Sequence, residues 1–184
     1  MKAAINLAKA MNRVADTSLP GELAGIVKLH SGIAVATAFI PVPGADMAAS
    51  ATNIWAMYVR MNKELKLPFS ENIVKSLAAG VATNLAGAGA AFLIVGSAFK
   101  FLPGLGSLGG AAIMGGTVYG VTLASGIIYM NALAKLLNAK HIQQINEKDL
   151  KGALDEIMKE KDAVETILNT AKEGYKEAKK NKEI

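Results

Sequence analysis

The sequence predicts an all-α membrane protein made of two helical hairpins, preceded by a basic amphipathic helix and followed by charged helices. Two observations predict this class. Of the 184 residues, 52% are hydrophobic and 18 are glycine, which exceeds the apolar share of about 45–50% in ordinary globular domains. Residues 76–134 contain a single charged side chain, that of Lys100. Uncharged stretches of this length are typical of helices that lie in a bilayer.

The first predicted element is an amphipathic helix within residues 1–17. One face carries the polar residues Lys2, Asn6, Lys9 and Arg13, and the other face carries Ile5, Ala8 and Met11. Basic residues interrupt every apolar run in this segment, so it does not resemble a signal peptide. A helix of this kind can lie on an anionic lipid surface or pack on the rest of the protein with its charges in water. The sequence leaves both possibilities open.

The first hairpin is predicted over residues 18–66. Its turn lies in Pro41-Val-Pro-Gly-Ala-Asp46, where Pro43 and Gly44 stop one helix and Asp46 is expected to cap the next. Trp55 and Tyr58 precede a basic residue, an arrangement typical of a membrane interface. We therefore expect this hairpin to be interfacial, re-entrant or packed against the second hairpin.

The second hairpin, over residues 70–140, is predicted to cross the membrane. The uncharged run 76–99 has 24 residues, about 36 Å as a helix at about 1.5 Å per residue, against a hydrocarbon core of about 30 Å. Pro103 and Gly104 form the turn, and Lys100 is expected to extend from the hairpin tip to the interface. Basic residues flank both ends of the hairpin, which predicts that both termini of the chain are cytoplasmic.

Glycine predicts how these helices pack. Nine glycines of residues 76–134 fall in predicted helix, and at about 1 kcal/mol each in water they would cost as much as a typical domain's whole stability. In lipid, small residues at every fourth position let two helices approach closely. One such row contains Ala79, Thr83, Gly87 and Ala91, and the other contains Ala112, Gly116, Gly120 and Ala124. We expect these rows to face each other or a second copy, as in a glycine zipper, which makes a homo-oligomer the expected state.

The last predicted element is a charged amphipathic helical tail over residues 145–182. Its apolar stripe includes Leu150, Leu154 and Ile157. Such a stripe can contact a partner, fold back on the chain or form a coiled coil, and the sequence does not choose among these.

Three segments resemble a known family. Phe39-Ile-Pro-Val-Pro-Gly-Ala-Asp46, Arg60-Met-Asn-Lys-Glu-Leu65 and the stretch from Phe101 to Ala111 look like the YcjF-type, GTPase-associated domain of unknown function. The similarity covers roughly residues 22 to 138. It implies a helical domain of the bacterial inner membrane, often fused to or encoded beside an Era-like GTPase and linked to envelope stress. A GTPase partner is therefore an expectation from the resemblance.

Chemical motifs are not found, and we expect no enzyme activity, cofactor or metal. The chain has no Cys, only two His and no P-loop sequence. Residues 104–109 match G-x-G-x-x-G, but they follow an apolar helix instead of a strand, so a close-packed turn is the better interpretation. The basic residues flank apolar runs and do not alternate with stacking aromatics, which argues against nucleic acid as a partner.

These observations favour a non-enzymatic membrane scaffold or adaptor with the lipid bilayer and other copies of itself as partners. One alternative is an oligomeric pore with a lumen formed by Asn84, Thr117, Thr122 and Ser125. A second alternative is a soluble oligomeric helical bundle that buries its apolar hairpin and binds membranes conditionally.

Overall fold

A computed structural model of the chain describes residues 21–37, 45–97, 108–141, 144–160 and 165–166. These residues form α2 (Gly21–Thr37), α3 (Ala45–Glu64), α4 (Glu71–Ser97), α5 (Leu108–Ala139) and α6 (Glu147–Lys159), and the described part contains no strand. The prediction of an all-α fold is confirmed.

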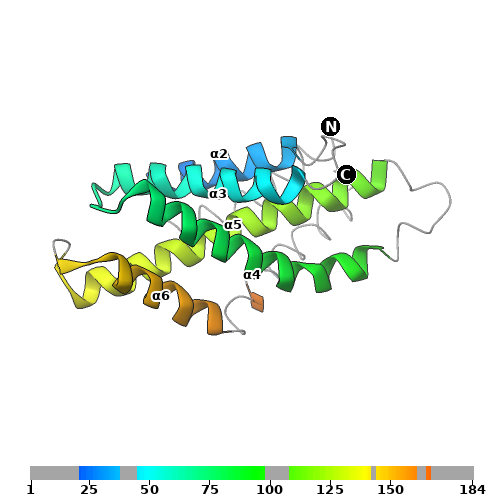
Figure 1. Ribbon diagram of the computed structural model, residues 1–184. Coiled ribbons are helices and arrows are strands. Elements are labelled where there is room, and N and C mark those ends of the chain that lie inside the picture. The colour runs from blue at the N-terminus through cyan, green and yellow to red at the C-terminus, as the bar shows by residue number, and fades with distance from the viewer. Residues whose placement is uncertain (1–20, 38–44, 98–107, 142–143, 161–164, 167–184) are drawn as a thin grey trace.

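The helices run alternately up and down along one common axis (Figure 1). The connections α3–α4 and α5–α6 lie at the same end of the molecule as the start of α2, and α2 and α4 both end toward the other end. Helix α2 packs on α3 and α5, and α3 packs on α4. Among the arrangements expected for the first hairpin, the described residues therefore show the one packed against the second. The long helices α4 and α5 extend beyond α2 and α3.

The two predicted Pro-Gly turns fall outside the described residues. Pro43 and Gly44 lie in the connection before α3, and Lys100, Pro103 and Gly104 lie in the connection between α4 and α5. Helix α3 begins at Ala45, and the side chain of Asp46 lies outside the described residues, so its role as a cap stays a prediction.

The core follows from the spacing of apolar residues on each helix. On α3, Ile54, Met57, Tyr58 and Met61 recur at three- and four-residue steps and are fully buried. Helix α4 buries Val74, Ala78, Val81 and Leu85, and α6 buries Leu150, Ala153, Leu154 and Ile157. Helix α5 is the central element, because every residue from Tyr119 to Tyr129 is buried.

The chain leaves α3 through a Schellman-type ending. The Leu67 N–H donates to the Asn62 carbonyl, the Lys66 N–H donates to the Lys63 carbonyl, and Lys66 has a φ of 53°. The following Leu67 is buried in the core. This ending directs the chain into Pro68 and the start of α4, as the Leu67-Pro68 pair suggests.

Candidate functional site

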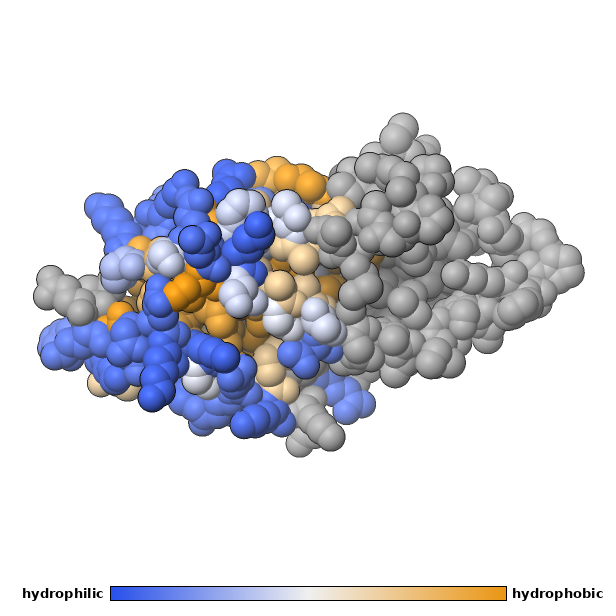
Figure 2. All heavy atoms as spheres, in the orientation of Figure 1, coloured by the Kyte–Doolittle hydropathy of each residue, from blue (hydrophilic) through white to orange (hydrophobic). Residues whose placement is uncertain are grey.

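Charged residues divide the bundle along its length. Glu22 and Lys28 lie in the first half of α2, and Arg60 and Lys63 lie near the end of α3. Glu71 and Lys75 lie near the start of α4, and Asp46, in the first turn of α3, is the exception toward the opposite end. Toward the opposite end, α4 and α5 carry no Asp, Glu, Lys or Arg in their described residues 76–97 and 108–134. In Figure 2 the hydrophilic colour covers the end with the α3–α4 and α5–α6 connections and gives way to pale and orange residues toward the middle.

The uncharged segments of α4 and α5 are at least as long as the hydrocarbon core of a bilayer is thick. At about 1.5 Å per residue, residues 76–97 of α4 extend about 33 Å and residues 108–134 of α5 about 40 Å, against a hydrocarbon core of about 30 Å. The uncharged part of α3, residues 47–59, is shorter at about 20 Å. In the described part of the chain one stretch, Val118–Ala139, is long and apolar enough to cross a membrane, and 72% of its most apolar window is buried inside the protein.

Two tyrosines join α3 to α5 in the interior. The Tyr58 hydroxyl lies 2.6 Å from Ser125 Oγ and donates to the Ser125 carbonyl at 3.1 Å, and the Tyr129 hydroxyl donates to Asn62 Oδ1 at 2.6 Å. The two rings stack with centroids 3.9 Å apart. Both hydrogen-bonded pairs are 67 residues apart in sequence, so they fix one parallel register of α3 on α5. We call these four residues the tyrosine clamp.

A second buried polar contact joins α2 to α3. Asn53 Nδ2 donates to the His30 carbonyl at 2.7 Å, which fixes the orientation of the amide and leaves Asn53 Oδ1 to accept from His30 Nδ1 at 2.8 Å. The imidazole therefore carries its hydrogen on Nδ1. His30 Nε2 and Asn62 Nδ2 have no hydrogen-bond partner within the described residues. His30 is therefore buried between α2 and α3 with one of its two ring nitrogens hydrogen-bonded.

Helices α2 and α5 approach closely at one glycine. A Cβ added at Gly126 would lie 2.7 Å from Val27 Cγ2. Only a residue without a side chain fits there, because Val27 is branched at Cβ and fully buried. At Gly126, which is not part of the predicted row, α5 therefore packs closely against α2.

The structure separates the two rows of small residues that we expected to meet. On α5, Gly120 and Ala124 are buried within the chain, whereas on α4 Ala79 and Thr83 are exposed. Inward packing of α4 instead uses Val74, Ala78, Val81 and Leu85. The expectation that the two rows face each other is wrong for these described members. Gly87, Ala112 and Gly116 lie in described helix, but their surroundings are outside the described residues.

The exposed face of α4 satisfies its own polar groups. Thr83 Oγ1 donates to the Ala79 carbonyl at 2.8 Å, and Asn84 Nδ2 donates to the Gly80 carbonyl at 2.9 Å. Gly80 is exposed, and a Cβ added there would meet nothing within 4 Å. We call Ser76, Ala79, Gly80 and Thr83 the α4 outer face. It is shallow and lacks charge, and the structure leaves it open.

The proposed pore lumen is not formed by the described residues. Asn84 lies on the exposed side of α4, whereas Thr122 and Ser125 are fully buried, with Thr122 bonded to the Val118 carbonyl and Ser125 to Tyr58. These side chains point to different surroundings, so they cannot line one channel. The surroundings of Thr117 lie outside the described residues.

The two aromatic residues expected at the membrane interface, Trp55 and Tyr58, differ in burial. Tyr58 is fully buried in the tyrosine clamp, which corrects our assignment of it to the membrane interface. Trp55 is partly exposed; its indole N–H donates to the Glu71 carbonyl at 3.3 Å, and Lys75 Nζ lies 5.5 Å from the ring centroid. Trp55 therefore sits beside the basic start of α4, where the charged end meets the uncharged segment.

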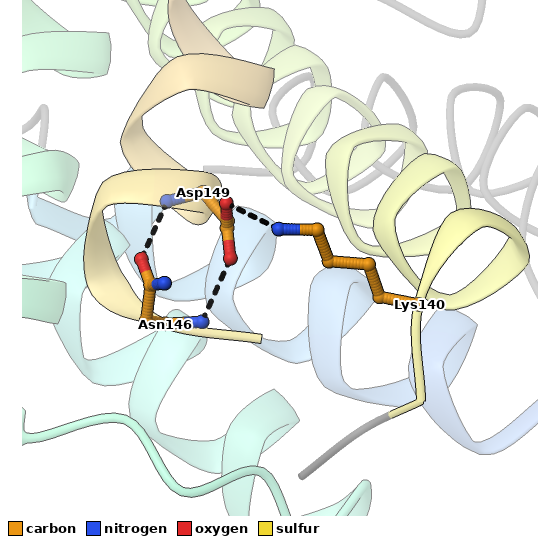
Figure 3. A network of polar contacts seen from close by, with 3 residues as sticks. All are labelled: Lys140, Asn146 and Asp149. Carbon is orange, nitrogen blue, oxygen red and sulfur yellow. Dashed lines mark hydrogen bonds and ion pairs between the residues drawn. The ribbon is translucent and has the colours of Figure 1, made fainter. Parts of the chain in front are cut away.

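Helix α6 is fixed at the charged end by a capping box (Figure 3). Asn146 Oδ1 accepts from the Asp149 N–H at 3.0 Å, Asp149 Oδ2 accepts from the Asn146 N–H at 3.1 Å, and Lys140 Nζ donates to Asp149 Oδ1 at 2.8 Å. The Lys140 contact and then the Asn146 N–H lower the pKa of Asp149. A second ion pair joins Lys135 to Glu156. In its described part, Glu147–Lys159, the predicted tail thus folds back on α5.

The described residues contain no group of three or more His, Asp or Glu side chains that could hold a metal ion. Several buried polar residues instead bond across helix interfaces, as in the tyrosine clamp and the His30–Asn53 pair. This arrangement is suited to holding helices in register and supplies no paired acid and base around a cavity.

Comparison with known proteins gives one informative similarity. The chain is 28% identical over 152 residues to magnetosome membrane protein 22 of Magnetospirillum gryphiswaldense, and the match covers 77% of this chain and 78% of that protein. No family model matches the chain. No solved structure matches it either.

Proposed function

We propose that this protein is a non-enzymatic membrane scaffold or adaptor whose uncharged half lies in the bilayer and whose charged end lies in the cytoplasm. The observation that carries the proposal is the division of charge along the bundle. The uncharged parts of α2, α3, α4 and α5 come from separate parts of the sequence, yet they gather on the same side of the charged connections.

The buried polar contacts support an interior suited to lipid. In a bilayer core no water is present to satisfy polar groups, so they must bond within the protein. Most polar atoms of the tyrosine clamp and of the His30–Asn53 pair bond between helices, with His30 Nε2 and Asn62 Nδ2 as exceptions in the described residues, and Thr83 and Asn84 bond within α4. The similarity to a protein named as a magnetosome membrane protein is a further support.

Self-association through the α4 outer face is part of the proposal. Gly120 and Ala124 are occupied by packing inside the chain, so of the two rows only that on α4 has described members open to a second copy. Its back-bonded Thr83 and unobstructed Gly80 allow two helices to approach with no polar group left unpaired. A scaffold built from repeated copies follows from this face.

The charged end is the proposed place for a cytoplasmic partner. Helices α2 and α6 both start there. That both termini are cytoplasmic is part of the proposal, and the basic residues that flank the second hairpin support it. A GTPase is the partner that the YcjF-type resemblance implies.

The test is membrane extraction with a matched pair of lysine substitutions. Asn72 and Thr83 are both exposed on α4, 11 residues apart, and therefore lie on nearly the same side of the helix. Thr83 lies in the uncharged segment, and Asn72 lies at the charged end. A lysine near the middle of a membrane helix costs about 2.5–3.5 kcal/mol on the insertion scale, so Thr83→Lys, at intermediate depth, should lose a part of that energy.

We expect the wild-type chain and Asn72→Lys to stay in membranes after sodium carbonate extraction and Thr83→Lys to be released in larger part. Release of the wild-type chain, or equal retention of both variants, would contradict the proposal. Circular dichroism of each variant in detergent checks that the helices form.

A bundle that binds membranes conditionally is the second candidate, and a specific observation favours it. Most of the apolar window of α5 is buried by the protein itself, as in the core helix of a water-soluble bundle. A monodisperse particle in buffer without detergent, with Thr83→Lys no different from wild type, would select this candidate.

A further inference from the structure

On the side of the charged end, the residues that border the uncharged segments of the bundle are all basic. Followed from the charged end, the last charged residue before each of these segments is Lys28 on α2, Arg60 on α3, Lys75 on α4 and Lys135 on α5. The acidic residues of α2, α3 and α4 at this end lie nearer to the helix ends, at Glu22, Glu64 and Glu71. The border of the uncharged half is therefore positively charged, and a border of this kind attracts anions.

Trp55 and Lys75 form a defined contact at this border. The indole N–H of Trp55 donates to the Glu71 carbonyl at 3.3 Å, and Lys75 Nζ lies 5.5 Å from the ring centroid. The polar edge of the indole is thus directed to the first turn of α4, while its ring is partly buried against the core. Tryptophan at the headgroup level of a membrane has the same character, with an apolar body and a polar edge toward water.

Lys75 is placed to receive an anion from outside the protein. Glu71, the nearest acidic residue on α4, already contacts Lys63 at 3.6 Å. Lys75 is exposed, and the group over which it lies is an aromatic ring without net charge. An ammonium group has three donors, so it can lie over a ring and still donate to an oxygen anion.

We propose that Lys75, held over Trp55, binds the phosphate of an anionic phospholipid whose headgroup lies at the border between the charged end and the uncharged half. The inference rests on the proposed function, which places the uncharged half in the bilayer, and it goes further by naming the class of lipid. Phosphatidylglycerol offers a phosphate with a net negative charge, whereas phosphatidylcholine supplies a cation of its own beside the phosphate. Selection between them therefore depends on the basic residue of the protein.

The single tryptophan of the chain makes the site directly measurable. Bromine on an acyl chain quenches tryptophan fluorescence at short range, so brominated phosphatidylcholine reports lipid beside Trp55. The full chain is placed in vesicles of this lipid, which is then replaced stepwise by unbrominated phosphatidylglycerol or, as the reference, by unbrominated phosphatidylcholine. Fluorescence of each variant is compared with that of the same variant in unbrominated vesicles, which removes any direct effect of the substitution on Trp55.

We expect phosphatidylglycerol to relieve quenching with an about fivefold preference over phosphatidylcholine, which corresponds to about 1 kcal/mol, the usual contribution of one basic residue near an anionic surface. Lys75→Gln should reduce the preference to about twofold or less, and Lys75→Arg should keep it. Lys151→Gln removes an exposed lysine of α6 and is the matched control, which should behave as the wild type. Raising the salt concentration from about 0.1 M to about 1 M should weaken the preference, because the Debye length shortens from about 10 Å to about 3 Å.

Three results would overturn the inference. Equal relief by the two unbrominated lipids would show that Trp55 lies beside lipid without an anionic site, and it would leave the proposed function intact. A preference that persists in Lys75→Gln would assign the anionic lipid to other residues. Absence of quenching by brominated phosphatidylcholine would show that acyl chains do not reach Trp55, and it would contradict the proposed function as well.

Discussion

At the scale of single residues, the tyrosine clamp allows the contribution of one hydroxyl group to stability to be measured. Tyr129→Phe keeps the stacked ring but removes the donor to Asn62 Oδ1. Asn62 is buried, and its Nδ2 already has no partner in the described residues. Without the Tyr129 hydroxyl, Asn62 Oδ1 also loses its hydrogen bond. We expect a loss of about 1–3 kcal/mol in the free energy of unfolding, the usual cost of a buried polar group left unpaired, measured by denaturant titration.

The double variant Tyr129→Phe/Asn62→Leu is the control for this prediction. It removes both partners, and exchange of both polar partners for apolar groups costs less than removal of one. The double variant should therefore be more stable than Tyr129→Phe alone. A double variant at least as destabilised as the sum of the two single changes would contradict the role of the hydrogen bond.

A second prediction concerns the close approach of α2 to α5. Gly126→Ala would place a Cβ 2.7 Å from Val27 Cγ2, which is closer than van der Waals contact allows. We expect Gly126→Ala to lose about 1–3 kcal/mol through overpacking, whereas Gly80→Ala on α4, where nothing lies within 4 Å, should gain up to about 1 kcal/mol in helix propensity. Thermal unfolding of both variants measures the contrast, and Val27→Ala should rescue Gly126→Ala.

The tyrosines show what the sequence could predict at this scale. Trp55 and Tyr58 are three residues apart, and both suit an interface by composition. Tyr58 shares its side of α3 with Ile54 and Met61 and is buried, whereas Trp55 lies on the neighbouring side and is partly exposed. The helical spacing contained this signal. The hydrogen-bond partners of the two tyrosines could not be predicted. Each bonded pair is 67 residues apart in the sequence, so the pairing depends on the register of α3 on α5.

At the scale of elements, α6 depends on its first turn. Only one side of this 13-residue helix is buried, and short helices are marginal without support at their ends. Asn146→Ala should therefore cost about 1 kcal/mol and increase amide hydrogen exchange at Leu150 and Leu154. Asn146→Ser, which keeps a side-chain acceptor, should stay close to wild type. Equal exchange in the alanine and serine variants would contradict the role of the cap.

The same turn predicts a dependence on pH. Contacts with Lys140 and with the Asn146 N–H lower the folded-state pKa of Asp149, so ionised Asp149 stabilises α6 at pH values above its ordinary pKa of about 3.9. This contribution is lost as the pH falls through the lower folded-state value. Carbon NMR of the Asp149 carboxyl should show the lowered pKa, and Lys140→Met should move it upward. An unchanged midpoint in Lys140→Met would contradict the assignment of the cause.

The elements themselves were largely predictable, and their packing partners were not. Apolar spacing, Leu67-Pro68 and the charged tail located α3, α4, α5 and the described part of the tail. The two rows of small residues are present in the sequence, but their described members do not face each other. The rotation of α4 about its axis is set by the buried side chains of Val74, Val81 and Leu85. Larger side chains bury more area than alanine or glycine, and they decided which side faces inward.

At the scale of the whole molecule, the α4 outer face is exposed, whereas Gly120 and Ala124 of the small-residue row on α5 are buried within the chain. If copies associate, the α4 outer face is therefore the surface on which they should meet. Substitution there tests association without disturbing the single chain, because Gly80 has open space around its Cα. Gly152 on α6 is equally open and lies on a helix at the charged end, which makes it a matched control.

We expect Gly80→Leu to weaken self-association and Gly152→Leu to leave it unchanged, since a leucine at a close helix contact holds the two backbones apart. Chemical crosslinking in membranes, and the concentration dependence of particle size in detergent, measure the difference. Both variants should unfold at temperatures close to wild type, so a loss of association in Gly80→Leu alone would be a property of the surface. If both variants associate as the wild type does, copies do not meet through α4, and the scaffold would require a different contact.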